Sequence, residues 1–368
     1  MTGPLRTALI MAGGTGGHVM PALAVAEALR GEGWRVVWLG TREGMEARLV
    51  SERGFEMAWV DFAGVRGKGL VSLAFLPLRI LRAFWQAAVA IRRIRPHVVA
   101  GLGGYVAFPG GMMASLLGRP LAIHEQNAVA GMTNRVLACL ADRVLLGVPG
   151  AFAQGVDRPI PCGKVATEWV GNPVRPEIAG LPAPAERYAG RTGPLHLLVI
   201  GGSLGARALN EIVPQALAGI AADRRPEVRH QAGARNIEEL KANYGAVQVE
   251  ADCLAFIDDM AAAYAWADVV ICRAGASTVA ELAAAGVPAA LVPFPSAVDD
   301  HQTLNARFLA DAGAAWLMPQ GELTAEGLAA WLAGLDRAEL QERGEQARAR
   351  AKPEATARMV AVVKEIAK

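Results

Sequence analysis

The segment MAGGTGGHVMP, residues 11–21, contains four glycines, a threonine and a histidine, His18. The apolar residues 8–12 predict a buried strand before it, and residues 21–29 predict a helix after it. Glycines allow backbone N–H groups to approach a ligand closely, and a helix N-terminus favours negative charge. The pattern therefore predicts an anion site with a histidine at its edge, although a tight turn without a ligand would use the same residue types.

Two familiar nucleotide motifs do not fit this segment. The dinucleotide fingerprint G-x-G-x-x-G fails because Val19 stands where its last glycine is needed. The next apolar run ends in Gly40, Thr41 and Arg42, without the carboxylate that holds ribose in dinucleotide-binding proteins. The chain also has no Gly-Lys-Ser/Thr tripeptide of a P-loop. An NAD-dependent oxidoreductase is therefore disfavoured.

A second segment, RAGASTVAE at residues 273–281, also opens a predicted helix with small and hydroxyl residues. Its backbone N–H groups, together with Ser277 and Thr278, suit a diphosphate. Glu281 lies about one helical turn further on, where it could accept both hydroxyls of a ribose or simply favour the helix dipole. Ser203 in GGSLGA is a helix-cap or phosphate candidate. The polar stretches at 124–127 (HEQN) and 299–305 (DDHQTLN) are sugar-contact candidates or ordinary strand-end loops.

These segments belong to an architecture that occurs twice along the chain. In each half, strands alternate with helices, which predicts an α/β fold with two parallel sheets in tandem, that is, two Rossmann-like domains. Ligands of such sheets bind at the carboxyl ends of the strands, where the polar clusters fall. We predict domains at residues 1–170 and 195–350, a linker without regular elements at 171–194, and a terminal helix at 351–368 that packs back on the first domain. Five prolines in the linker support that boundary.

The amino-acid composition limits the class of protein and the compartment. With 368 residues, 53% hydrophobic and 20% charged, the chain is long and apolar enough for two globular domains. The four cysteines form no C-x-x-C pair, which favours a reducing compartment with neither a zinc site nor disulfides. The N-terminus lacks the pattern of a signal peptide, and glycines and Pro109 interrupt the long uncharged stretch at residues 96–118.

The charges are unevenly distributed although the net charge is only +2. No acidic residue occurs between Asp61 and Glu125, whereas eight cations do: Arg66, Lys68, Arg79, Arg82, Arg92, Arg93, Arg95 and Arg119. Helical periodicity in residues 70–96 gives an apolar face (Leu78, Leu81, Trp85, Val89) and a polar face (Arg79, Arg82, Gln86, Arg93). This pattern, beside the apolar residues 70–76, predicts contact with an anionic membrane surface, or else a core helix with a solvated basic face. Nucleic acid is disfavoured because no recognised binding module accompanies the charge.

Taken in order, eight motifs between residues 11 and 306 resemble those of the bacterial peptidoglycan glycosyltransferases that convert lipid I to lipid II, in glycosyltransferase family 28. They are GGTGGHV, GGYV, HEQN, GNPVR, GGSLGAR, FIDDMA, RAGASTVAE and DHQTLNA. The resemblance implies the GT-B fold, two Rossmann-like domains with a deep interdomain cleft. It also implies the donor UDP-N-acetylglucosamine, the acceptor lipid I and other cell-wall synthesis proteins as partners, and a peripheral place on the cytoplasmic face of the inner membrane. No cofactor is implied, and no metal either, because the Asp-x-Asp clamp of other transferases is absent.

The resemblance also assigns roles to individual residues. Asn127 and Gln302 are expected to contact the sugar, Glu281 the ribose, and the backbone of Ile257 the uracil. The full set expected to bind UDP-N-acetylglucosamine is Thr15, Gly16, Gly17, Asn127, Arg175, Ser203, Ile257, Ala276, Ser277, Thr278, Val279, Ala280, Glu281 and Gln302. Gly13, Gly14 and Tyr105 are expected to bind the acceptor. Roles at His301 and Leu204 are less defined, because relatives differ there.

An inverting transfer needs a base for the acceptor hydroxyl and stabilisation of the leaving diphosphate. His18 is the first candidate base, because the positive end of a helix dipole should keep its imidazole neutral. His124 and Glu125 are the competing catalytic candidates, at the end of a neighbouring strand. The anion of the first glycine loop would then be the diphosphate of the acceptor.

Two alternatives remain open from the sequence. A UDP-N-acetylglucosamine 2-epimerase resembles the same two-domain architecture but would have no use for the basic, acid-free segment. A non-catalytic nucleotide-sugar sensor would not require the candidate bases in GGHV and HEQN.

Overall fold

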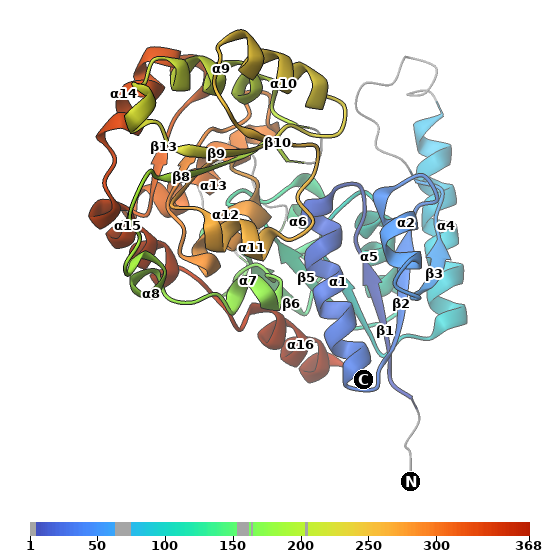
Figure 1. The fold of residues 1–368 in the computed structure, drawn as a ribbon. Coiled ribbons are helices and arrows are strands. Elements are labelled where there is room, and N and C mark those ends of the chain that lie inside the picture. Colours follow the sequence, from blue (N-terminus) through green and yellow to red (C-terminus); the bar gives the residue numbers. More distant parts are fainter. Residues whose placement is uncertain (1–4, 63–74, 153–161, 163–164, 203–204) are drawn as a thin grey trace. The chain divides into compact units, whose positions relative to one another are not determined.

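The structure is a computed structural model that describes residues 5–62, 75–152, 162, 165–202 and 205–368. The chain forms two compact units, one of residues 1–173 and 352–368 and the other of residues 174–351. Each unit contains a parallel sheet with helices packed against it (Figure 1). The predicted α/β architecture with two Rossmann-like domains is therefore confirmed.

The sheet of the first unit has the strand order β3-β2-β1-β4-β5-β6-β7, and every neighbouring pair is parallel. This order is that of a Rossmann sheet with an added edge strand. The strands are β1 (Thr7–Met11), β2 (Arg35–Gly40), β3 (Glu56–Trp59), β4 (Val98–Gly101), β5 (Leu121–Glu125), β6 (Arg143–Leu146) and β7 (Glu168–Trp169). The helices are α1 (Gly16–Gly31), α2 (Met45–Ser51), α4 (Leu76–Ile94), α5 (Ala107–Leu116), α6 (Met132–Leu137) and α16 (Ala355–Ile366).

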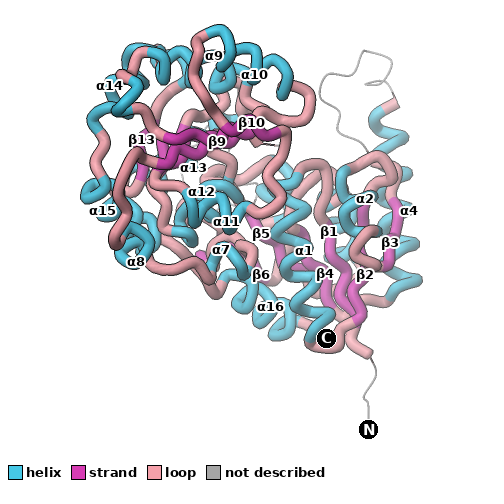
Figure 2. The backbone as a smooth tube through the Cα atoms, viewed as in Figure 1, coloured by secondary structure: helices cyan, strands magenta, loops and turns pink. Residues whose placement is uncertain are grey.

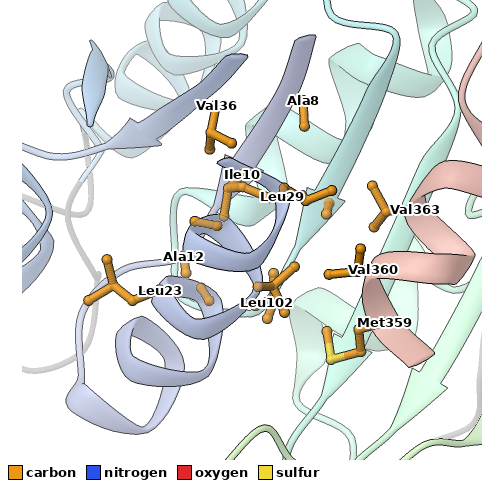
Figure 3. Close-up of a cluster of buried hydrophobic side chains, with 14 of the residues drawn as sticks. Ala8, Ile10, Ala12, Leu23, Leu29, Val36, Leu102, Met359, Val360 and Val363 are labelled. Carbon is orange, nitrogen blue, oxygen red and sulfur yellow. The ribbon is translucent and has the colours of Figure 1, made fainter. Parts of the chain in front are cut away.

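Both faces of this sheet are buried because alternate residues of each strand point to opposite sides. Ala8 and Ile10 of β1 pack with α1 and α16, whereas Leu9 and Met11 pack with residues of α4, α5 and α6. Figure 3 shows Met359, Val360 and Val363 of α16 beside the β1 and α1 side chains. The C-terminal helix thus completes the core of the first unit.

The second unit repeats this plan with the strand order β10-β9-β8-β11-β12-β13, again parallel throughout. Figure 2 shows strands of this unit in magenta among cyan helices. The strands are β8 (His196–Ile200), β9 (Glu227–Gln231), β10 (Asp252–Leu254), β11 (Val269–Cys272), β12 (Ala289–Leu291) and β13 (Ala315–Leu317). The helices are α7 (Pro176–Ala179), α8 (Pro184–Tyr188), α9 (Arg207–Ala218), α10 (Ile237–Ala246), α11 (Met260–Trp266), α12 (Ala276–Ala285), α13 (His301–Ala310), α14 (Ala325–Gly334) and α15 (Arg337–Ala349). Short 3-10 turns lie at Ala222–Arg224, Val298–Asp300 and Gln320–Glu322.

Two helix predictions are corrected. Helix α1 begins at Gly16 rather than Pro21, so that His18 lies in its first turn and Pro21 lies inside the helix. The segment 171–194, for which we predicted no regular element, contains α7 and α8. Each of these begins with a proline, whose fixed φ angle and missing N–H group suit the first position of a helix.

The cysteine prediction is wrong for one pair. Cys139 and Cys162 form a disulfide, with Cα atoms 5.6 Å apart, whereas Cys253 and Cys272 are free. The two bonded residues are 23 positions apart in the sequence, and their spacing carries no sign that the fold brings them together.

The amphipathic segment forms α4, and its large apolar side chains face solvent. The small residues Ala83 and Ala87 with Ile91 pack inward, while Leu78, Leu81 and Trp85 are each about two-thirds exposed. The core-helix alternative is therefore excluded for α4. Residues 63–74, with Arg66, Lys68 and part of the apolar run, lie outside the described residues. Among the helices that the structure describes, none is both long and apolar enough to cross a membrane.

Candidate active site

The loops that follow β1 and β4 meet at the point where the strand order of the first sheet reverses. Ligands of open α/β sheets bind at this point, beyond the carboxyl ends of the strands. Gly103 and Gly104 both have positive φ angles, +97° and +84°. A Cβ atom on Gly104 would lie 2.3 Å from the carbonyl oxygen of Gly13, so the two loops can only pack this closely with glycine there.

The carboxylate of Glu46 is hydrogen-bonded to the first glycine loop. Glu46 is buried and accepts hydrogen bonds from the N–H of Gly14 (3.0 Å) and from the N–H (3.0 Å) and hydroxyl (2.7 Å) of Thr41. A Cβ atom on Gly13 would lie 2.7 Å from the same carboxylate. The N–H of Gly14 is thus already bonded to a carboxylate of the protein itself.

Removal of this carboxylate should destabilise the first unit. We expect Glu46→Ala to lower the free energy of unfolding by about 1 to 3 kcal/mol, because buried N–H donors lose their acceptor. Urea unfolding of the full chain measures the difference. Glu43→Ala is the matched control, since Glu43 is exposed in the segment just before α2 and its replacement should change stability by about 0.5 kcal/mol or less. Equal stabilities of the two variants would contradict the role given to Glu46.

A chain of hydrogen bonds connects His18 to the end of β5. Nδ1 of His18 lies 3.0 Å from Oε1 of Gln126. The amide nitrogen of Gln126 donates to the carbonyl of Leu102 (2.8 Å) and lies 3.1 Å from Nδ1 of His124. Nε2 of His124 lies 3.0 Å from the carbonyl oxygen of Gly171.

His124 and Glu125 have their polar atoms occupied within the protein. Burial, with a smaller contribution from the nearby His18 ring, lowers the pKa of His124 to about 4, so its imidazole is neutral at pH 7. The carboxylate of Glu125 accepts from the N–H and the amide of Asn127, the N–H of Gly131 and the amide of Asn134. Glu125 is 3% exposed, compared with His18, which is half-buried in the first turn of α1.

In the second unit an uncharged residue, Gln231, is hydrogen-bonded to the glycine loop, as Glu46 is in the first unit. Gln231 accepts a hydrogen bond from the N–H of Gly202 (3.0 Å) and donates to its carbonyl (3.1 Å). Gly202 and Gly14 occupy matching places after the first strand of each sheet, and both have positive φ angles. The first unit therefore has a carboxylate behind its loop where the second has an amide.

Helix α12 begins directly after β11, at the strand reversal of the second sheet. The six consecutive residues predicted there for the donor are Ala276, Ser277, Thr278, Val279, Ala280 and Glu281. The first turn of the helix has no acidic side chain, because Glu281 lies beyond it. The hydroxyl of Ser277 is buried and has no hydrogen-bond partner among the described residues. A helix N-terminus with such a hydroxyl can bind an anionic oxygen.

Glu281 lies on α12 between two partners from other elements. One carboxylate oxygen accepts from Arg175 (2.9 Å) and the other from the hydroxyl of Tyr264 (3.2 Å). Burial raises the pKa of the Glu281 carboxyl, and the charge of Arg175 opposes this shift. The structure therefore brings together Arg175 and Glu281, two residues that the sequence predicts for the donor site.

The other predicted residues are distributed over both units. Thr15, Gly16 and Gly17 lie at the start of α1, Tyr105 is about half exposed before α5, and Asn127 bonds to Glu125. In the second unit, Gln302 accepts from the N–H of Phe294 (2.9 Å), and Ile257 packs partly buried against the core. Ser203 and Leu204 lie outside the described residues.

The sequence did not indicate the supporting residues Glu46, Gln126, Gln231 and Tyr264. Gln126 lies inside the HEQN motif, but as a candidate for sugar contact, whereas it is 1% exposed and bonded to protein groups. Gln231 is the last residue of β9, and this strand-end position could have indicated it. Tyr264 and Glu46 carried no such signal.

Two Rossmann-like units in one chain, each with a glycine loop and a polar strand-end cluster, fit the class of two-domain glycosyltransferases, and comparison with known proteins separates this class from others of the same architecture. Models of glycosyltransferase family 28 match the chain twice, its N-terminal domain at residues 8–146 and its C-terminal domain at residues 196–363. The chain belongs to glycosyltransferase family 28.

Proteins of similar sequence and structure indicate which members of this family the chain resembles. A protein of Thiobacillus denitrificans is 61% identical over 363 residues, and one of Dechloromonas aromatica is 58% identical over 363 residues, with 99% of both chains covered in each case. Both are named UDP-N-acetylglucosamine–N-acetylmuramyl-(pentapeptide) pyrophosphoryl-undecaprenol N-acetylglucosamine transferase. The crystal structure of Acinetobacter baumannii MurG is 41% identical, with a TM-score of 0.82 over 98% of this chain and 99% of that one. The family resemblance indicated by the ordered motifs is confirmed.

Proposed function

We propose that this chain transfers N-acetylglucosamine from UDP-N-acetylglucosamine to the muramoyl 4-hydroxyl of lipid I, giving lipid II with inversion at the anomeric carbon. The names of relatives about 60% identical over nearly the whole chain support the donor and the acceptor. The structural observation that carries the reaction is the hydrogen-bond chain at His18, Gln126 and His124. In this chain the imidazole of His18 is hydrogen-bonded beyond the carboxyl ends of the strands, where ligands of this fold bind.

His18 is the base in this proposal. The acceptor hydroxyl attacks the anomeric carbon as UDP leaves, and its proton passes to the ring of His18. His124 is the weaker candidate because both of its ring nitrogens lie within hydrogen-bond distance of protein groups. Glu125 is weaker because four donors from the protein occupy its carboxylate.

The second unit binds the donor. The N-terminus of α12, with the hydroxyls of Ser277 and Thr278, stabilises the diphosphate as it leaves, and Glu281 holds the ribose beside Arg175. The glycine loop of this unit suits an anion because Gln231 behind it is uncharged.

The first unit binds the acceptor, but we now assign its glycine loop to an uncharged part of the molecule. A diphosphate at Gly13 and Gly14 would meet the carboxylate of Glu46, which already takes the N–H of Gly14. At about 5 Å, two like charges repel by roughly 3 kcal/mol at the effective dielectric constant of a protein surface. Gly13, Gly14 and Tyr105 are therefore proposed to contact the acceptor sugar.

Incubation with the donor alone and with added lipid I analogue tests the activity. We expect no new sugar from UDP-N-acetylglucosamine alone, and free UDP with a glycosylated lipid when the analogue is present. A manno-configured product from the donor alone would indicate an epimerase. Binding of the donor without turnover under either condition would indicate a sensor.

Helix α4 is proposed to attach the protein to the cytoplasmic face of the inner membrane. The exposed apolar row Leu78, Leu81, Trp85 and Val89 is accompanied by exposed arginines, of which Arg82 pairs with Asp61. Apolar side chains can enter the interface of a bilayer while arginines attract anionic lipid headgroups. The acceptor carries a lipid chain, so this attachment would bring enzyme and substrate to the same surface.

Vesicle sedimentation tests the role of α4. We expect binding to vesicles that contain phosphatidylglycerol, weaker binding at high salt, and a loss of about 10-fold or more for the double variant L81S/W85S. Phe256→Ser is the matched control, because Phe256 is equally exposed (64%, compared with 66% for Trp85) in the second unit. Undiminished binding of the double variant, or no binding of the unmodified chain, would contradict the proposal.

A further inference from the structure

The hydrogen-bond chain at His18 fixes where its protons lie, because it ends on groups that can only accept. The carbonyl oxygens of Leu102 and Gly171 have no proton to donate. The group 2.8 Å from Leu102 O must therefore be the amide nitrogen of Gln126, and Nε2 of His124 must carry the proton that faces Gly171 O.

The remaining proton positions follow from these two. Since Nε2 of neutral His124 is protonated, its Nδ1 has a lone pair and accepts from the Gln126 amide. The carbonyl oxygen of that amide then faces His18, and Nδ1 of His18 must donate to it. A neutral His18 ring with its proton on Nδ1 has its lone pair on Nε2.

We infer that Gln126 is a positioning residue that selects the Nδ1–H tautomer of His18, so that Nε2 is the nitrogen that accepts the proton of the acceptor. This inference rests on the proposed role of His18 as the base. Gln126 is 1% exposed and touches neither substrate in this account; it acts through His18. His124 and Leu102 in turn prevent the amide of Gln126 from rotating, because rotation would place its oxygen against a carbonyl oxygen and a nitrogen lone pair.

The hydrogen bonds of this chain need not change when His18 takes the proton of the acceptor. When Nε2 takes a proton, Nδ1 of the imidazolium continues to donate to the same oxygen of Gln126, so every hydrogen bond in the chain is kept. Such preorganisation lowers the barrier for proton transfer. The ring lies close against Gly103, where only glycine leaves room for it, because a Cβ atom on Gly103 would lie 2.5 Å from Nδ1 of His18.

The test is the tautomeric state of His18 in the full chain. The protein has six histidines, so ¹⁵N labelling of histidine gives few ring signals, and His18→Asn identifies those of residue 18. Long-range ¹H–¹⁵N correlation spectra at pH 8 should show Nδ1 protonated and Nε2 unprotonated for His18, with the opposite pattern for His124. A His18 ring protonated on Nε2 would overturn the inference.

Two variants separate positioning from a purely structural role. Gln126→Leu removes the acceptor, so His18 should lose its preference for Nδ1–H and turnover should fall by about 100-fold with the donor KM unchanged. Gln126→Glu keeps an acceptor oxygen toward His18. Its second oxygen can stand 2.8 Å from the Leu102 carbonyl oxygen only when it carries a proton, so this neutral carboxyl group should retain the Nδ1–H tautomer of His18. If Gln126→Leu unfolds, the spectrum of Gln126→Glu still decides, because a loss of Nδ1 protonation there would overturn the inference.

Failure of this inference differs from failure of the proposed function. If the unmodified chain shows the expected tautomers but transfers no sugar, the proposed function is wrong while the proton positions stand. If it transfers sugar but Gln126→Leu changes neither the tautomer nor turnover, Gln126 does not position His18.

Discussion

Replacement of His18 by alanine is expected to lower turnover by about 100-fold or more, the usual scale for the loss of a general base. Binding of UDP-N-acetylglucosamine should remain nearly unchanged, because His18 belongs to the first unit and the proposed ribose site at Glu281 to the second. Steady-state transfer kinetics and calorimetry with the donor measure the two effects separately.

Two further variants make this result specific. His18→Gln retains a polar side chain but cannot hold the proton of the acceptor, so it should be nearly as impaired as alanine. His97→Gln is the matched control: His97 precedes β4 at the amino ends of the strands, away from His18, and accepts from the N–H of Thr7, so turnover should stay within about twofold. If His18→Gln turned over like the unmodified chain across the pH range, the base would have to be sought elsewhere.

Replacement of Glu281 by alanine is expected to weaken binding of UDP by about 2 to 4 kcal/mol. A ribose held by two charge-assisted hydrogen bonds loses both, and Arg175 loses the partner that holds it near the site. Calorimetry with UDP measures the change, and binding of a lipid I analogue should be affected far less.

Tyr264→Phe is the matched control for Glu281. It removes the 3.2 Å hydrogen bond to the carboxylate but leaves both the carboxylate and its pair with Arg175. We expect it to weaken UDP binding by about 1 kcal/mol or less. Unchanged affinity of Glu281→Ala would remove Glu281 from the donor site.

The fold was largely predictable because its signals are local. Runs of apolar residues followed by glycine and a helical pattern occur in both halves, and such alternation leads to parallel sheets. The start of α1 was missed because Gly16 and Gly17 disfavour a helix locally, yet the helix forms there in the folded unit. The disulfide was missed because it depends on an approach between distant residues that no local pattern records.

The site was predictable where function coincides with strand ends and glycine loops. His18 lies on the helix that follows β1 and Glu281 on the helix that follows β11, so residue type and position were sufficient to make both of them candidates. The residues that hold them were not predictable in the same way. Gln126 lies 108 positions from His18 and Glu46 lies 32 positions from Gly14, so these contacts exist only in the folded unit.

The most direct test of the central claim is the anomeric configuration of the product. The full chain is incubated with α-linked, ¹³C-labelled UDP-N-acetylglucosamine and a lipid I analogue, and the isolated glycolipid is examined by NMR. A single displacement assisted by one base predicts one labelled N-acetylglucosamine, β-linked to the muramoyl 4-hydroxyl. An α-linked product, or no labelled glycolipid at all, would contradict the account.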